Sequence, residues 1–133
     1  MRHIKLIGLL FIALLIQACP ESSKDPDMQF TIKNESTENI YFYANTSDAT
    51  VMSKDIGKGY GYLIPIKIGD FYNIPFWINL FNQSKKLNIL IYKQSTLDMH
   101  SWEDIQKNDI FDKRYVLTLE ELKSMNYTVM YKE

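Results

Sequence analysis

Leu87-Asn88-Ile89-Leu90-Ile91-Tyr92 is the stretch of sequence that decides the fold of this chain. Leu87, Ile89 and Ile91 fall at alternate positions, so an extended backbone places all three on the same face. The polar residues 83–86 that precede the segment form a predicted turn. The sequence therefore predicts a β-strand over these six residues, with an aliphatic face toward a core.

Two further strands are predicted near the start of the domain. Residues 28–33 alternate between apolar and polar side chains, which is the pattern of a half-buried strand. Ile40-Tyr41-Phe42-Tyr43-Ala44 is apolar or amphipathic on both faces, which indicates a central strand. The polar residues 34–39 between them favour a hairpin that joins the two strands. A short strand is also predicted at Val51 and Met52.

Two of the predicted strands contain proline. Residues 63–68 include Pro65, and the aromatic-rich residues 71–81 include Pro75, after which Trp77-Ile78-Asn79-Leu80-Phe81 is a further strand candidate. Proline cannot donate a backbone hydrogen bond to a neighbouring strand, so it is confined to sheet edges and bulges. The strand around Pro65 is therefore predicted to be an edge strand or to carry a bulge.

The last third of the chain adds helix signals to the strand pattern. Ser101-Trp102-Glu103-Asp104 can open a short helix with Ser101 as its N-cap. Thr118-Leu119-Glu120-Glu121 fits the capping box, and Asn126 is a suitable stop for the helix that it opens. Residues 111–117 and 127–131 are predicted strands on either side of this second helix.

Together these elements predict the fold class. The succession of short strands and polar turns, with no βαβ rhythm, is typical of a mainly β protein. We expect residues 28–133 to form a single antiparallel β-sandwich of about seven strands, immunoglobulin-like or transthyretin-like, with two short helices late in the chain. An α+β arrangement is the alternative.

The first 27 residues carry no pattern of this kind and predict a targeting segment. Arg2, His3 and Lys5 precede an apolar run, Leu6 to Ile16, which is too short for a membrane-spanning helix but fits a secretory signal peptide. We expect residues 1–18 to be that signal peptide. Residues 19–27 follow as a tether that begins with Cys19 and contains too little apolar surface to build a core.

Ile16-Gln17-Ala18-Cys19 resembles a bacterial lipobox, although Gln17 stands where a small residue is commoner. The resemblance implies that Cys19 is lipidated and becomes the first residue of the mature chain. An ordinary secreted protein with a free thiol is the alternative. Two or three acyl chains would hold the protein on a membrane permanently, whereas one chain holds only marginally.

Most of the mature chain, apart from residues 51–81, resembles an uncharacterised family of small Bacteroidetes lipoproteins. The family implies a lipid-anchored protein of the cell envelope, at the outer membrane, and it brings no established activity or catalytic residue. The resemblance rests on the segments Phe30-Thr31-Ile32-Lys33-Asn34, Ile40-Tyr41-Phe42, Thr96-Leu97, Ser101-Trp102-Glu103-Asp104-Ile105, Lys113-Arg114-Tyr115, Leu117-Thr118-Leu119-Glu120-Glu121-Leu122-Lys123 and Met125-Asn126-Tyr127-Thr128.

The charge balance argues against nucleic acid as a partner. Removing the leader takes Arg2 and Lys5 away, which leaves 13 basic residues against 16 acidic residues and a mature net charge of 13 − 16 = −3. Neutralising phosphates requires a basic surface, and a net negative chain is not expected to present one.

The supply of catalytic and metal-binding side chains is also small. After the leader the chain has one histidine, His100, and one cysteine, Cys19, whereas zinc usually takes three or four such ligands. We therefore expect no metal, no cofactor and no Cys–His catalysis. The paired acids Glu103-Asp104 and Glu120-Glu121 fall in the first turns of the predicted helices, where acids favourably oppose the helix dipole, so we interpret them as structural.

Three residues remain as candidates for ligand binding. Arg114 is the only arginine after the leader, and we expect a salt bridge to Glu120, Glu121 or Asp112, with capture of an anionic ligand as the alternative. Tyr60 and Tyr62 lie in the glycine-rich loop 57–62, where exposed aromatic rings could anchor a partner. Phe76 and Trp77 are expected to be core residues.

Two classes of function follow. The first is a non-enzymatic binding or interaction module, tethered to the outer membrane, that recognises a glycan or an envelope protein. The second is a hydrolase of the envelope that uses carboxylates. The scarcity of histidine and cysteine favours the binding module.

Overall fold

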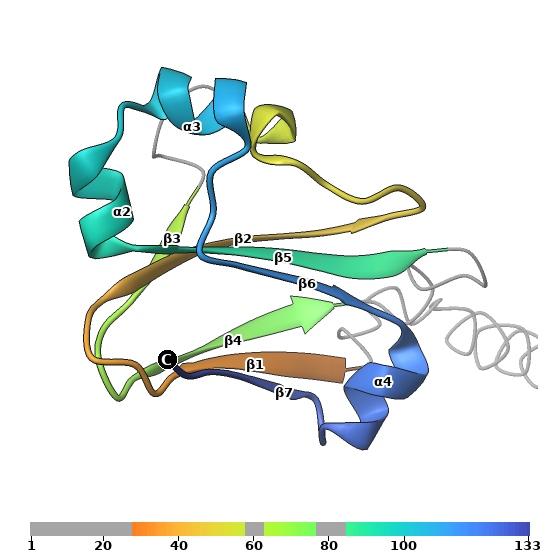
Figure 1. The fold of residues 1–133 in the computed structure, drawn as a ribbon. Helices are drawn as coiled ribbons and strands as arrows, with labels where there is room; N and C mark the ends of the chain where they lie inside the picture. Colours follow the sequence, from red (N-terminus) through yellow and green to blue (C-terminus); the bar gives the residue numbers. More distant parts are fainter. Residues whose placement is uncertain (1–27, 58–62, 77–84) are drawn as a thin grey trace, which may run out of the picture.

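Two β-sheets stacked face to face form the centre of the molecule (Figure 1). The structure, a computed structural model, describes residues 28–57, 63–76 and 85–133. One sheet has the strand order β4-β1-β7, with β1 (Met28–Asn34), β4 (Phe71–Phe76) and β7 (Thr128–Tyr131). The other has the order β3-β2-β5-β6, with β2 (Ile40–Ser47), β3 (Ile64–Ile66), β5 (Lys86–Lys93) and β6 (Lys113–Leu117). The predicted β-sandwich is confirmed.

A layer of helices covers the outer face of the four-stranded sheet. It consists of α2 (Gln94–Met99), α3 (Trp102–Asn108) and the 3₁₀ turn η1 (Ser53–Asp55), which lie above β2 and β5 in Figure 1. A further helix, α4 (Leu119–Ser124), connects β6 to β7 at one end of the sandwich. The molecule therefore has three layers, with the four-stranded sheet in the middle.

The middle position of that sheet explains the composition of β5. Its residues Leu87, Ile89 and Ile91 face the other sheet, as predicted, and are essentially buried. Leu90 and Tyr92 point the opposite way and are equally buried, against the helical layer. Both faces of β5 are covered, because the three-stranded sheet packs on one face and η1 and α3 pack on the other.

The space between the sheets holds the larger core. Phe30 and Ile32 of β1 meet Ile40 and Phe42 of β2 there, all four fully or almost fully buried. Leu122 of α4 joins the same cluster and closes its end. Tyr41 and Tyr43 alternate with Ile40 and Phe42 along β2 and pack against the second cluster, under the helices. The prediction of a central strand with two apolar faces is confirmed for β2.

The predicted hairpin between the first two strands is wrong. β1 pairs with β4 and β7, whereas β2 pairs with β3 and β5, so the first two strands lie in different sheets. The linker forms an arch from one sheet to the other, and the β3–β4 linker crosses back at the same end. Asn34 fixes this crossing, because its side chain bonds within the first arch and also to Ile66 of β3.

One strand pairing departs from the predicted antiparallel arrangement. β7 runs parallel to β1, with Ile32 opposite Val129, while the other four pairings are antiparallel. The chain reaches β7 from β6 through α4, and this connection crosses from the four-stranded to the three-stranded sheet. A connection of this kind, unlike a tight hairpin, allows β7 to run parallel to β1.

Three local predictions can be compared with the strands. Pro65 lies in β3, at the edge of the four-stranded sheet as predicted, and Pro75 lies in β4, an edge strand of the three-stranded sheet. Val51 and Met52 do not form the predicted strand; they lead into η1, where the Met52 backbone N–H donates to Asp55 Oδ2 at 2.7 Å. The predicted strand at residues 77–81 lies outside the described residues.

The two predicted helices are confirmed, and a third was not predicted. Ser101 Oγ accepts a hydrogen bond from the Asp104 N–H at the start of α3, and Thr118 does the same for Glu121 at the start of α4. Asn126 ends α4 in the left-handed conformation, with φ 49°. The unpredicted helix is α2, because the groups that hold its first turn come from distant parts of the sequence and not from a local cap.

Candidate functional site

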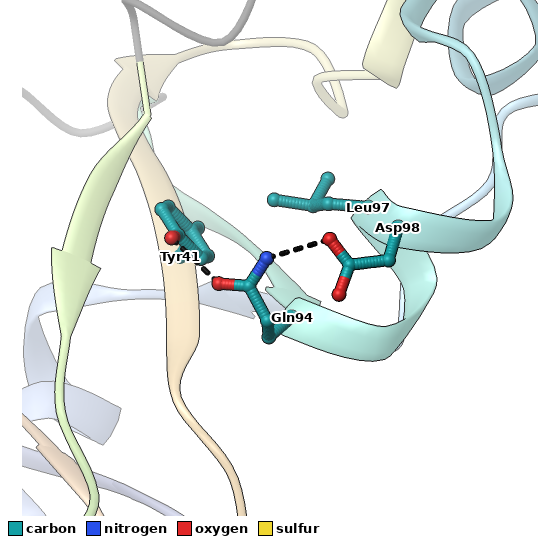
Figure 2. Close-up of a pocket in the computed structure, with 4 residues that line it drawn as sticks. All are labelled: Tyr41, Gln94, Leu97 and Asp98. Atoms are coloured by element: carbon teal, nitrogen blue, oxygen red, sulfur yellow. Dashed lines mark hydrogen bonds between the residues drawn. The ribbon is translucent and has the colours of Figure 1, made fainter.

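A pocket of about 280 Å³ opens between β2 and α2 in the helical layer. Its described lining consists of Tyr41 from β2 and of Gln94, Leu97 and Asp98 from α2 (Figure 2). None of these four residues was predicted from the sequence as a site residue. The pocket combines an aromatic ring, an aliphatic side chain, an amide and a carboxylate, which is a small set of polar groups on an apolar wall.

The secondary structure sets the direction of each lining side chain. Tyr41 points toward the helices because its neighbours Ile40 and Phe42 point into the space between the sheets. Gln94 and Asp98 lie four residues apart on α2, so they share one face of the helix. Leu97 packs against the second core cluster and forms the apolar side of the pocket.

A chain of hydrogen bonds orders the polar groups of the pocket. The Tyr41 hydroxyl donates to Gln94 Oε1 at 2.7 Å, and Gln94 Nε2 donates to Asp98 Oδ1 at 2.8 Å (Figure 2). Gln94 keeps a second N–H, and Asp98 keeps its Oδ2 oxygen; within the described residues neither has a hydrogen-bond partner. The pocket therefore presents one free donor beside a free carboxylate oxygen.

The start of α2 is held by two segments that are distant from it in sequence, the arch before β2 and the residues before β6. The Lys93 N–H donates to Asp112 Oδ2 at 2.7 Å, and the Ser95 N–H donates to Glu38 Oε2 at 2.8 Å. The Gln94 N–H donates to the Asn39 carbonyl at 2.9 Å. These bonds satisfy backbone donors that every helix leaves open at its N-terminus, and they fix Gln94 against β2.

Arg114 forms a salt bridge as predicted, but with a different acid. Its Nη2 lies 2.8 Å from Asp109 Oδ2, and its guanidinium stacks 4.1 Å from the centre of the Phe111 ring. Asp112 binds α2 instead, and Glu121 accepts from the Thr118 backbone, so neither is the partner of Arg114. Asp109 is available because it follows α3 in a left-handed conformation, φ 50°, that turns the chain back toward β6.

Asp109 links Arg114 to the buried interior of the helical layer. Its Oδ1 accepts from the Ser53 N–H at 2.7 Å, and the Ser53 hydroxyl lies 2.9 Å from the Tyr92 hydroxyl. Burial raises the pKa of Asp109, but the hydrogen bonds from Arg114 and Ser53 lower it by more, so its net pKa lies below the ordinary value. Burial raises the pKa of Tyr92 to about 12.

This cluster joins η1, α3 and β6, and we interpret it as structural. Arg114 Nε is buried and has no hydrogen-bond partner among the described residues, but Nη2 bonds Asp109 and the guanidinium lies over the Phe111 ring. Arg114 does not line the Tyr41 pocket. The structure thus places Arg114 in a support for the helical layer and does not bring it to the candidate site.

Cys19, Tyr60 and Tyr62, the other predicted site residues, lie outside the described residues, and so does Trp77, which was expected in the core. His100 is the C-cap of α2 and is half-buried. The acid pairs lie in the first turns of α3 and α4, as predicted, where Glu121 closes the capping box with Thr118. No group of three histidine, cysteine or acidic residues in the described part of the chain could hold a metal ion.

One sequence signal could have indicated the pocket. Gln94 and Asp98 stand at i and i+4, a spacing at which an amide and a carboxylate bond on a helix. That signal has meaning only once residues 94–99 are recognised as helical, and they carry no local cap.

In the segments that the structure describes, no helix is long and apolar enough to cross a membrane. Comparisons with protein-family models, with curated proteins and with solved structures found no match.

Proposed function

We propose that this chain is a lipid-anchored protein of the cell envelope whose sandwich domain binds a glycan in the Tyr41 pocket and catalyses no reaction. The observation that carries the proposal is the arrangement of the Tyr41 ring, the Gln94 amide and the Asp98 carboxylate around one pocket. The sequence supports the anchor, through the apolar run before Cys19 and the resemblance to small Bacteroidetes lipoproteins.

The chemistry of the pocket fits a sugar that carries neighbouring hydroxyl groups. One hydroxyl can donate to Asp98 Oδ2 while its neighbour accepts from the second N–H of Gln94. Tyr41 and Leu97 supply an apolar wall for the C–H face of the sugar ring. The free carboxylate disfavours acidic sugars, because like charges repel. A neutral or amino sugar is the class of ligand that these groups suit.

The same lining favours binding over hydrolysis. Hydrolysis of a glycosidic bond by carboxylates uses two acids placed about 5–9.5 Å apart, on opposite sides of the bond. Of the four described residues that line the pocket, Asp98 alone is acidic. The paired acids of α3 and α4 have structural roles in the first turns of those helices. We therefore prefer the binding module to the envelope hydrolase.

The anchor is tested by Cys19→Ser. A fatty-acid probe fed to expressing cells should label the wild type and should not label the variant, which should remain uncleaved or appear in soluble form. Asp70→Ala, an exposed change far along the chain, serves as the control for expression. Equal labelling of wild type and Cys19→Ser would contradict the anchor without bearing on the pocket.

Glycan binding is tested with Asp98→Ala on a glycan array, using the full chain in detergent. A lost hydrogen bond to a charged group is worth about 1.5–3 kcal/mol, so the variant should bind its best glycan at least about tenfold more weakly. Glu103→Ala is the matched control, because Glu103 is an exposed acid on the neighbouring helix α3. Equal binding by wild type and Asp98→Ala, or no binding to any glycan, would refute the proposed site.

A further inference from the structure

The outer face of the three-stranded sheet differs from every other sheet face in the molecule. Both inner faces are packed together, and the helical layer covers the outer face of the four-stranded sheet (Figure 1). Among the described elements, none covers the outer side of β4-β1-β7. Alternation along the strands assigns Lys33, Phe71 and Met130 to this side, because Ile32, Tyr72 and Val129 face inward.

Exposed apolar side chains concentrate on this sheet and on the turn that leads into it. Phe71 is 57% exposed, Met130 47%, and Ile68 in the turn 58%. Tyr72 is 40% exposed, but its ring lies against Phe42 on the inner side of the sheet, so it does not belong to this face. Met99 on α2 is the other large exposed apolar residue of the described chain. Isolated exposed residues are ordinary on protein surfaces, but grouping them on one uncovered face indicates a contact surface.

The charged groups on this face are mainly basic. Lys33 is the direct strand neighbour of both Phe71 and Met130, so a lysine lies between the two apolar side chains. Lys33 and Lys132 share one acid, Glu35, at 2.8 and 2.9 Å, which leaves this trio with one net positive charge. Apolar side chains interleaved with lysine suit the boundary between lipid headgroups and acyl chains, where the lysine stem lies in the apolar zone and its ammonium meets anionic headgroups.

The chain outside the structure joins the domain at this same sheet. Met28 is the first residue of β1, the central strand of β4-β1-β7. Eight residues lie between Cys19 and Met28, and the nine residue steps that they make span at most about 30 Å. A seven-residue strand such as β1 is about 23 Å long. A lipid on Cys19 therefore keeps the whole outer face of this sheet within reach of the membrane.

We infer that the outer face of β4-β1-β7 rests on the lipid surface to which Cys19 is anchored. This inference rests on the lipid anchor of the proposed function. The order of the three layers then directs the helical layer, and the Tyr41 pocket within it, away from the membrane. The occupant of the face is the bilayer itself, so the contact needs no further protein.

Site-directed spin labelling of the full lipidated chain tests this inference. Cys19 carries the lipid in that form, so a cysteine introduced at position 71 or 130 is the one free thiol. Phe71→Cys and Met130→Cys probe the face, and Met99→Cys is the control because Met99 is also a large exposed apolar residue, 72% exposed, but lies in the helical layer. Each labelled protein is measured in detergent and in vesicles of phosphatidylethanolamine and phosphatidylglycerol, with a water-soluble nickel relaxation agent.

The expected result is a severalfold loss of nickel accessibility at positions 71 and 130 on transfer from detergent to vesicles, with no loss at position 99. Equal accessibility in the two media at positions 71 and 130 would overturn the inference. Protection that is already present in detergent, together with a doubled mass, would also overturn it, because a second copy would then cover the face. A chain that takes label at Cys19 and does not float with the vesicles would instead refute the anchor of the proposed function.

Discussion

Asn34 shows how one side chain can define the path of two chain segments. Its Nδ2 donates to the carbonyls of Glu38 and Ile66, at 2.8 and 3.1 Å, and its Oδ1 accepts from the N–H and hydroxyl of Ser36. An asparagine amide offers two donors and two acceptor sites, so all four are used in a fully buried position. The backbone of Asn34 also bonds to Gly69 and Asp70 of the second arch.

We expect Asn34→Ala to lower the free energy of unfolding by about 3 kcal/mol, because it leaves buried carbonyl and hydroxyl groups without partners. Urea denaturation measures the change. Asn39→Ala is the matched control, since Asn39 lies exposed in the same arch and its side chain makes one long bond of 3.3 Å. If the two variants lose equal stability, Asn34 does not fix the crossing of the arches.

The Arg114–Asp109 pair gives a prediction for pH. The pKa of Asp109 is lower in the folded chain than in the unfolded chain, where it is about 3.9. Ionised Asp109 therefore adds to the free energy of unfolding at pH values above its pKa in the unfolded chain. This contribution is lost as the pH falls through its pKa in the folded chain. Between about pH 5 and pH 2, the wild type should lose more stability than Asp109→Asn, which keeps the left-handed turn but cannot ionise.

Urea midpoints at a series of pH values measure this difference. Glu35, Glu121 and Glu133 also have lowered pKa values, and they are present in both proteins, so their effects cancel in the comparison. Parallel pH profiles for the two proteins would mean that ionised Asp109 contributes nothing to stability.

Sequence reasoning identified Arg114 as a paired residue but named the wrong partners. The lone arginine predicted a salt bridge, and the acids named as partners were Asp112, Glu120 and Glu121. The partner depends on the left-handed residue that ends α3, which brings Asp109 back beside β6. Asp is tolerated in that conformation, but the sequence gives no sign that it is used at position 109.

At the level of elements, the sequence predicted the helices whose first N–H groups bond to a nearby side chain. It did not predict the helix whose first N–H groups bond to residues distant in sequence. α3 and α4 begin with Ser101 and Thr118, whose side chains accept from the third residue of their own helix. α2 has Lys93 at its N-cap, with no side-chain bond, and its first donors reach Asp112, Asn39 and Glu38. Those partners become neighbours only after the sheets form, so the candidate pocket on α2 could not be predicted.

The capping box of α4 makes a direct prediction. Thr118 Oγ1 accepts from the Glu121 N–H, and Glu121 Oε2 accepts from the Thr118 N–H. Thr118→Ala should cost about 1 kcal/mol of unfolding free energy, because an N-cap bond is lost. Thr118→Ser keeps the hydroxyl and should stay close to the wild type. Equal denaturation midpoints for the alanine and serine variants would show that the cap does not stabilise α4.

Asp112 should control the order of α2. Its two carboxylate oxygens accept from the Lys93 N–H and from the Thr96 hydroxyl, at 2.7 and 2.9 Å. In Asp112→Ala we expect faster amide hydrogen exchange across α2, because its first turn loses two partners, and unchanged exchange in α3, which has its own cap. Unchanged exchange in α2 would indicate that Glu38 and Asn39 hold the helix without Asp112.

At the level of the whole molecule, periodicity predicted the layers and could not predict how the strands are shared between them. The alternation of apolar residues gave the strands and the buried faces of β2 and β5 correctly. Local sequence favoured a hairpin between β1 and β2, but an arch needs the same polar linker. The bond from Asn34 to the Ile66 carbonyl, which holds the arch, joins residues that are 32 positions apart. The parallel pairing of β1 with β7 joins segments about a hundred residues apart, which no local pattern encodes.

That long-range pairing makes the C-terminal strand necessary for the sandwich. Val129 and Tyr131 of β7 are buried in the main core, and each buried side chain of this size contributes about 2 kcal/mol. Deleting residues 126–133 also removes the hydrogen-bonded neighbour of β1, so the total loss approaches the stability of a small domain, about 5–15 kcal/mol. We expect this truncation to abolish cooperative urea unfolding. Removing only Lys132 and Glu133 breaks partly exposed ion pairs and should cost little, because such pairs contribute about 0–1 kcal/mol. A sharp unfolding transition in the longer truncation would mean that β1 and β4 hold the core without β7.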